Sequence, residues 1–274
     1  MWRVPRRAWL WVVLAAALLA PTEGKAQPRV GLVGDLVHAY AVQPGESVEG
    51  LVVLSNADDQ PQTVRLYLQD YHTDDQGHPV YSAPGRHARS NAEWIALGQS
   101  TVTVPPGQHL AVPYTVRVPA DATLVGTYWS ALMVEPVEAE EGSVAPDRPV
   151  VTIRHVWRYA IHVVTDIAGT GEARLAFVRP RLLDDGGNLA LQVDMVNEGV
   201  RWLRPKVWLE IYDQEGRLAA RVDGGPARLY PGEVVRQRLR LGSLPPGAYE
   251  VLLVADDGDA HVFAAHYRFV VGPR

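Results

Sequence analysis

The side chains that could carry chemistry in this sequence are few and fall in short polar stretches. The densest group of imidazole and carboxylate side chains is His72, Asp74, Asp75 and His78. Such groups can bind a divalent metal ion. The stretch at 74–77, Asp-Asp-Gln-Gly, is also typical of a hairpin turn, and it lacks the later glutamate of a calcium-binding loop. We therefore predict a turn and no metal site here, and likewise in the loops at 184–188 and 256–259.

The sequence offers no pattern for nucleophilic catalysis. It contains no cysteine and no Gly-x-Ser-x-Gly turn, and it places no histidine beside a serine in a turn. Glycine-rich phosphate-binding loops ahead of helices are missing, and carboxylates gather only in turns, where no cleft selects two of them for acid–base work. We predict that the protein is not an enzyme and that it uses no cofactor.

One tryptophan stands apart as a candidate contact residue. Most tryptophans after residue 26 alternate with apolar residues along expected strands, where they fill cores. Trp202 instead lies between Arg201 and Arg204 in an expected loop. Its ring combines a large apolar body with an N–H donor, and arginines can stack on it. We predict that Trp202 contacts either a ligand or a neighbouring domain.

The run from 150 to 164 is the longest alternating segment and the best candidate for binding a partner. It places Arg154, Arg158 and His162 on one face and apolar residues on the other. An open sheet edge can bind an extended segment of a partner through main-chain hydrogen bonds. We predict partner binding by these three residues and by the strand itself. The competing interpretation is that the run is an interior strand.

The amino-terminal residues have the pattern of a secretory signal. Three arginines within residues 1–7 precede an unbroken apolar stretch at 8–20, which is too short for a membrane span of about 20 residues. We predict cleavage after Ala26 and export to the periplasm or the cell surface. Arg6 and Arg7 leave a twin-arginine route open beside the general pathway. No second apolar run of spanning length follows.

The charge and composition of the chain after Ala26 narrow its partners. It keeps 22 basic and 30 acidic residues, a net charge of about −8, so nucleic acid is not an expected partner. Without cysteines there are no disulfides, and stability has to come from a hydrophobic core. We expect the partner to be an envelope or surface protein, or peptidoglycan.

Short Val-, Leu-, Tyr- and Thr-rich runs separated by Pro-Gly and Asp-Gly turns predict an all-β chain of two tandem immunoglobulin-like β-sandwiches. We place the first sandwich at 27–166 and the second at 167–274, with a hinge near 166–172. Expected strands of the first sandwich are 37–42, 47–55, 63–71, 101–104, 110–118, 127–134 and 150–165. Expected strands of the second are 173–182, 189–197, 206–212, 218–222, 234–241, 248–255 and 260–271.

Several turn and strand-end motifs carry a resemblance to known families. They are Gln43-Pro44-Gly45, Leu54-Ser55-Asn56, the stretch Ser90 to Ile95, Val104 to Gln108, Asn197-Glu198-Gly199 and Pro245 to Tyr249. The chain resembles WxL-interacting cell-surface proteins, which usually end in a transmembrane helix, whereas this sequence ends at Arg274 just after an expected strand. More distantly it resembles periplasmic pilus chaperones.

The two resemblances imply two related functions. The first implies an exported, non-catalytic protein that binds another envelope component through Ig-like domains. The second implies a chaperone that donates its 150–164 strand to a pilus subunit and anchors the carboxylate end of that subunit with a basic pair. Arg154 or Arg158 matches the basic residue of the last strand. His38 and Tyr40 stand where the first-strand arginine would be expected.

Overall fold

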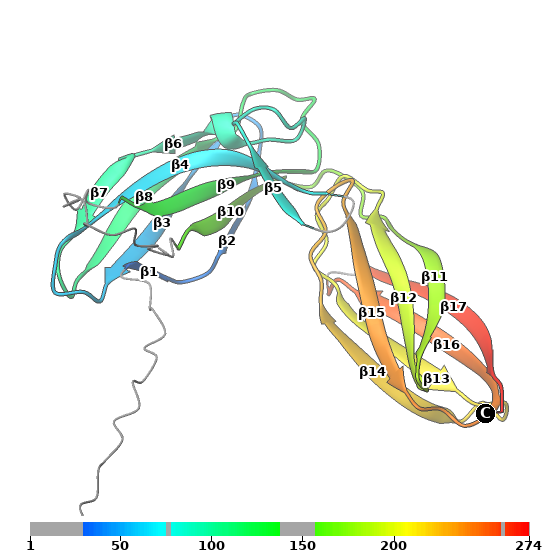
Figure 1. The fold of residues 1–274 in the computed structure, drawn as a ribbon. Coiled ribbons are helices and arrows are strands. Elements are labelled where there is room, and N and C mark those ends of the chain that lie inside the picture. Colours follow the sequence, from blue (N-terminus) through cyan, green and yellow to red (C-terminus); the bar gives the residue numbers. More distant parts are fainter. Residues whose placement is uncertain (1–29, 75–77, 138–156, 259–260, 274) are drawn as a thin grey trace, which may run out of the picture.

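The computed structural model describes residues 30–74, 78–137, 157–258 and 261–273. Within these residues the chain forms 17 β-strands and one short 3-10 helix. The strands gather into two bodies in sequence order, the first from β1 to β10 and the second from β11 to β17 (Figure 1). This confirms the prediction of an all-β chain with two immunoglobulin-like sandwiches. No helix of the described part of the chain is long and apolar enough to span a membrane.

The first sandwich consists of two facing sheets. One has the order β1-β3-β8-β6, and the other has the order β2-β10-β9-β4-β5, with β7 also paired to β4. Its elements are β1 (Val30–Val33), β2 (Val37–Val42), β3 (Ser47–Asn56), β4 (Gln62–Thr73), β5 (Pro79–Ser82), η1 (Ala92–Trp94), β6 (Ile95–Leu97), β7 (Thr101–Val104), β8 (His109–Arg117), β9 (Thr127–Pro136) and β10 (Tyr159–Ile167).

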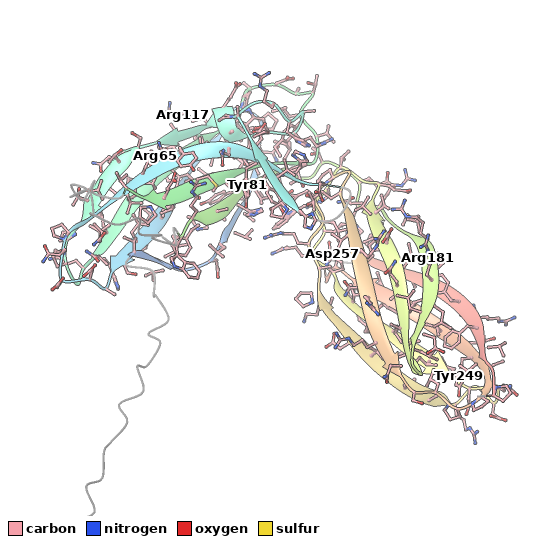
Figure 2. All side chains as sticks on the ribbon, viewed as in Figure 1. Arg65, Tyr81, Arg117, Arg181, Tyr249 and Asp257 are labelled. Carbon is pink, nitrogen blue, oxygen red and sulfur yellow. The ribbon has the colours of Figure 1, made fainter. Side chains whose placement is uncertain are left out.

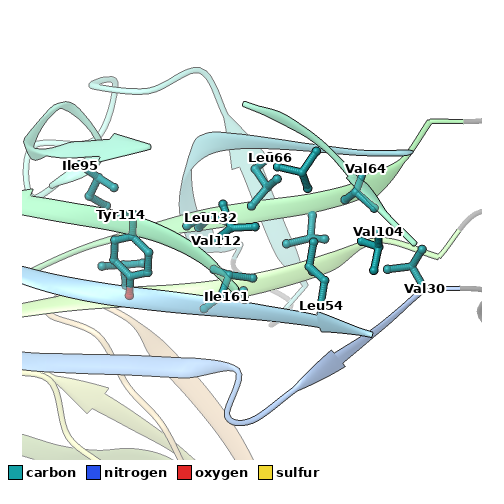
Figure 3. Packing of buried hydrophobic residues seen from close by; sticks show 14 of the residues in the cluster. Val30, Leu54, Val64, Leu66, Ile95, Val104, Val112, Tyr114, Leu132 and Ile161 are labelled. Carbon is teal, nitrogen blue, oxygen red and sulfur yellow. The ribbon is translucent and has the colours of Figure 1, made fainter. Parts of the chain in front are cut away.

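Period-two alternation builds the core of this sandwich. In β3, Val52 and Leu54 are buried, whereas Leu51, which directly precedes Val52, is 56% exposed. Successive side chains of a strand point to opposite faces, so only alternate residues enter the core. Figure 3 shows Leu54, Leu132 and Ile161, which come from three different strands, packed in one cluster between the sheets.

The second sandwich repeats this plan with a separate core. Its sheets have the orders β11-β12-β15 and β14-β13-β16-β17. Met195, Leu209, Ile211 and Leu253 are fully buried between them. The strands are β11 (Leu175–Asp185), β12 (Asn188–Asn197), β13 (Lys206–Tyr212), β14 (Leu218–Pro226), β15 (Val234–Gly242), β16 (Gly247–Asp256) and β17 (Val262–Val271).

The first strand of each sandwich follows a different path. In the first sandwich the chain leaves β1, turns at Gly34 with φ 106°, and changes sheet, so that β2 pairs with β10 in parallel. In the second sandwich β11 stays beside β12 along its whole length, with a register shift between Val178 and Arg181. The last strand of the first sandwich is therefore covered by β2 along part of its edge, whereas β17 pairs, among the described strands, with β16 alone.

The observed strands match the expected ones closely, with informative differences. The strands β2, β7 and β13 have the expected bounds, and most others differ from the expected bounds by one to four residues at an end. The short strands β1, β5 and β6, of three or four residues each, were not expected. The expected strand 150–165 corresponds to β10, and its first part, 150–156, lies outside the described residues.

Candidate partner-binding site

The strand β10 is an interior strand along one part and an edge along another. Residues 159–166 pair with β9, and residues 162–167 also pair with β2 on the other side. The interior interpretation therefore holds from His162 onward. In the described chain, Tyr159, Ala160 and Ile161 pair with β9 alone, so the side of β10 that β2 occupies further along is open here.

The backbone geometry of β10 shows which atoms this open edge presents. The His162 N–H donates to the Leu36 carbonyl at 2.8 Å, so it points toward the β2 side. Backbone N–H groups two residues apart point the same way in a strand. The Ala160 N–H therefore points out of the open edge. Trp157, just before the strand, is 51% exposed, so an apolar ring lies beside the open backbone groups.

A charged cluster lies next to this edge on the outer face of the same sheet. The Glu135 carboxylate of β9 accepts one hydrogen bond from Arg65 of β4 and forms an ion pair with Arg158, each at 2.8 Å. The bond from Arg65, with help from the charge of Arg158, lowers the pKa of the Glu135 carboxyl below its ordinary value. The side chain of Arg158 is 58% exposed. Figure 2 shows Arg65 on the first sandwich, on the strand labelled β4 in Figure 1.

The other end of the same face is covered by the second sandwich. Tyr230, which lies between β14 and β15, is fully buried, and its hydroxyl is 2.8 Å from Nδ1 of His162. Its ring stacks on Trp129 with centroids 4.6 Å apart, and Tyr71 meets the His162 ring edge-on at 4.4 Å. Burial, with a smaller effect of Arg228, lowers the pKa of His162 to about 3. The imidazole is therefore neutral over the ordinary pH range.

Trp202 lies in the same junction and joins the two sandwiches by polar contacts. Its indole N–H donates to the Asp166 carboxylate at 2.9 Å, and its backbone N–H donates to the Thr127 hydroxyl at 2.9 Å. The ring is 7% exposed and packs with Trp129, Val164 and Tyr230. A second polar link runs from the Thr73 hydroxyl to the buried carboxylate of Glu233.

The segment that connects the sandwiches is bound to both of them. The Gly126 N–H donates to the Thr170 hydroxyl at 2.9 Å, and the Val200 N–H donates to the Glu172 carbonyl at 3.0 Å. Gly126 has φ +75°, and a Cβ there would lie 2.2 Å from the Val200 carbonyl oxygen. The backbones of the two sandwiches meet closely enough at this point to require glycine.

The strand β2, which pairs with part of the β10 edge, is anchored to the opposite sheet by a buried polar group. Tyr114 of β8 is 2% exposed, and its hydroxyl lies 2.6 Å from Nδ1 of His38 and 2.8 Å from the Tyr40 hydroxyl. Gly50 leaves the room for this group, since a Cβ there would lie 2.2 Å from the Tyr114 ring. Two side chains of β2 are thereby tied to the opposite sheet.

The four predicted contact residues lie in different places. Arg154 lies outside the described residues. Arg158 lies at the open edge and pairs with Glu135. His162 and Trp202 are 5% and 7% exposed and contact residues of the other sandwich. While the two sandwiches are packed in this way, a binding partner cannot contact these two side chains. Sequence reasoning missed Tyr230 and Tyr71, because nothing in their local spacing separates a junction tyrosine from a core tyrosine.

Comparisons with known proteins reveal a likeness of structure only. No protein-family model matches this chain, and no curated protein matches it by sequence. One solved chain comes from a chaperone–tip adhesin complex of CFA/I fimbriae biogenesis, with TM-score 0.50 and 9% identity over 87% of this chain and 98% of that chain. The class 5 fimbriae chaperone CfaA has TM-score 0.47 and 11% identity over 88% and 99% of the two chains. The CsuC–CsuE chaperone–subunit complex of Acinetobacter baumannii has TM-score 0.46 and 12% identity over 86% and 97%.

The first of these likenesses supports a shared two-sandwich fold, and it agrees with the more distant of the two resemblances, that to pilus chaperones. The resemblance to WxL-interacting proteins is not supported, because no family model matches. Peptidoglycan as the partner gains no support either.

Proposed function

We propose that this chain is an exported, non-catalytic assembly chaperone that binds a pilin-like or adhesin-like surface subunit along the open edge of β10. The observation that carries the proposal is the change of pairing along β10, from two neighbours at His162 to one neighbour at Ala160. We also propose the bounds 1–26 for a signal peptide, and 27–166 and 167–274 for the two domains.

Strand addition suits this edge for two physical reasons. The main-chain N–H and carbonyl of Ala160 point to the open side and need partners, and an extended segment of a subunit can supply them along the direction of the strand. The edge is also preorganised, because β10 is fixed on its other side by β9 and further along by β2 and Tyr230. Binding then orders less of the chaperone, which favours affinity.

The fold likeness supports the same function. The similar chain of TM-score 0.50 belongs to a complex whose name pairs a chaperone with a tip adhesin. A more general envelope-binding protein is also compatible with the fold, but the part of β10 that is unpaired on one side among the described residues favours a partner that binds by strand addition.

A photo-crosslinking residue placed at Trp157 tests the proposal in the native host. We expect crosslinks from position 157 to an exported surface subunit, and none from Leu51, which is 56% exposed on β3, a strand of the opposite sheet. The variant Ala160→Pro removes the outward N–H without removing a bond to β9, so it should abolish the crosslink. Ala160→Ser keeps the N–H and should preserve it. Equal crosslinking in the two variants, or crosslinking of 157 to glycan alone, contradicts the proposal.

A further inference from the structure

The edges of the sheets differ greatly in how well they are protected from pairing with another chain. Native sheets protect exposed edges by keeping strands short, by bulges, by proline and by charge. The edge strands β1, β5 and β6 have only three or four residues. The edge strand β11 is interrupted by a register shift at Arg179-Pro180, and β14 has two register shifts and ends at Gly224-Gly225-Pro226.

The edge strand β15 is also protected. It carries outward arginines at 236, 238 and 240, and its Gln237 side chain donates to the Gly224 carbonyl of β14 at 2.6 Å, which closes that side of the second sandwich.

The strand β17 lacks three of these protections and keeps only the charge of Arg268, which pairs with Glu250 of the neighbouring strand β16. It runs for ten residues, pairs with β16 in unbroken register from Val262 to Val271, and contains neither proline nor glycine. Its other edge pairs with no described strand. Val262 and Val270, near its two ends, are 62% and 73% exposed, the two highest values among the exposed large hydrophobic residues of the described chain. The Tyr267 hydroxyl is buried and makes no hydrogen bond within the described residues.

The outer residues of β17 are symmetric about His266, and the inner ones pair a small residue with a large one. Moving outward from His266, the matched positions are 265 with 267 (Ala and Tyr), 264 with 268 (Ala and Arg), 263 with 269 (Phe and Phe), and 262 with 270 (Val and Val). In an antiparallel pair of identical strands centred on residue 266, these matched positions face each other. Small residues then face large ones, and like apolar residues face each other at the ends. A twofold interface requires such self-complementarity.

We propose that the free edge of β17 is a self-association surface, on which β17 of a second copy pairs antiparallel about a twofold axis at His266. The two four-stranded sheets would join into one continuous sheet across the axis. The surface lies in the second sandwich, away from the open edge of β10, so the inference does not depend on the proposed chaperone function.

Paired charge variants of the chain from residue 27 test the register, with sedimentation equilibrium as the measurement. We expect a concentration-dependent dimer of the unmodified protein. The double variant Val262→Lys with Val270→Lys places lysine opposite lysine twice across the axis and should raise the dimer dissociation constant roughly tenfold or more. Val262→Glu with Val270→Lys places opposite charges at the same points and should restore the dimer. Leu218→Lys on β14, also exposed, is the matched control and should change nothing.

Cysteine crosslinking gives an independent test of the pairing register of β17, because the chain has no cysteine of its own. His266→Cys should form an intermolecular disulfide under mild oxidation, since the two residues face each other at the axis. Arg268→Cys should not, because its copies would be offset by four residues, about 14 Å along the strand, beyond the reach of a disulfide.

The proposal is overturned by a protein that stays monomeric at every concentration, by equal behaviour of the Lys/Lys and Glu/Lys variants, or by equal crosslinking at 266 and 268. Since crosslinking of a subunit at Trp157 is a separate measurement, failure here leaves the chaperone proposal standing.

Discussion

The Nδ1 atom of His162 and the hydroxyl oxygen of Tyr230 lie 2.8 Å apart and join the last strand of the first sandwich to the β14–β15 connection of the second. Both side chains are buried, and their rings stack with centroids 5.8 Å apart. A neutral imidazole satisfies this bond, whereas a protonated one would bury a charge in a mostly aromatic site. The packing of the two sandwiches is therefore linked to the ionisation of one histidine.

The first prediction concerns the loss of stability at the domain junction in acid. The folded-state pKa of His162 is about 3, below the ordinary value of 6.5, so the unfolded or separated state binds the proton more readily. The stability that the neutral ring provides is complete above pH 6.5 and is lost as pH falls from there toward 3, at no more than about 1.4 kcal/mol per pH unit. His162→Asn, which keeps a polar atom near Nδ1, should flatten this part of the pH profile of thermal unfolding. An unchanged profile contradicts the assignment.

The second prediction separates backbone strain from contact between the sandwiches. Gly126 and Gly169 both have positive φ, +75° and +71°, so alanine is strained at either site. Only at Gly126 would the new Cβ meet the second sandwich, 2.2 Å from the Val200 carbonyl oxygen. Gly126→Ala should therefore enlarge the radius of gyration in small-angle X-ray scattering, and Gly169→Ala should leave it unchanged. Equal radii for the two variants would show that the contact does not hold the sandwiches together.

Sequence reasoning predicted the fold well because buried apolar residues alternate with exposed polar ones along most strands of this protein. The predicted stretches 37–42, 101–104 and 206–212 have the same bounds as β2, β7 and β13. Turn-forming residues such as Gly, Pro, Asp or Ser lie close to both ends of each stretch and mark where the strand stops. The same reasoning failed for β1 and β5, which are defined by their pairing with β3 and β4 rather than by a local pattern.

The site was less predictable, because it depends on contacts between distant residues. Alternation assigned Arg154, Arg158 and His162 to one face of one strand; Arg158 lies just before β10, His162 lies within it, and Arg154 lies outside the described residues. It could not show that Tyr230, 68 positions after His162, covers one end of that face and leaves the other end open. The change of sheet between β1 and β2, which decides where the edge is open, depends on three residues around Gly34 that carry little pattern.

The third prediction concerns the buried group that anchors β2. Alanine at Gly50 would place a Cβ 2.2 Å from the Tyr114 ring and 2.4 Å from the Tyr40 hydroxyl, in a site with no free space. Gly50→Ala should lower the free energy of unfolding by about 1–3 kcal/mol, as expected for an overpacked core. Gly247→Ala in β16, where the nearest atom is 3.8 Å away, is the control and should have little effect. Equal unfolding midpoints in urea for the two variants would contradict this packing.

The last prediction concerns Asp194, a buried carboxylate between two arginines of the second sandwich. Arg236 donates to it at 2.7 and 3.0 Å and Arg179 at 2.8 Å, and these bonds, led by that of Arg236, lower the pKa of the carboxyl to about 2. Since the folded-state pKa is depressed, the stabilisation is present above pH 4 and is lost as pH falls through about 2.

Both arginines are more than half exposed, so solvent screening limits the contribution of Asp194 to about 1–2 kcal/mol. Asp194→Asn should lower the free energy of unfolding by that amount at pH 7 and have a smaller effect near pH 2, where the native carboxyl is itself becoming protonated. Denaturant titrations at the two pH values measure the difference. A penalty that is the same at pH 7 and pH 2 would mean that the carboxylate matters for its shape and hydrogen bonds and not for its charge.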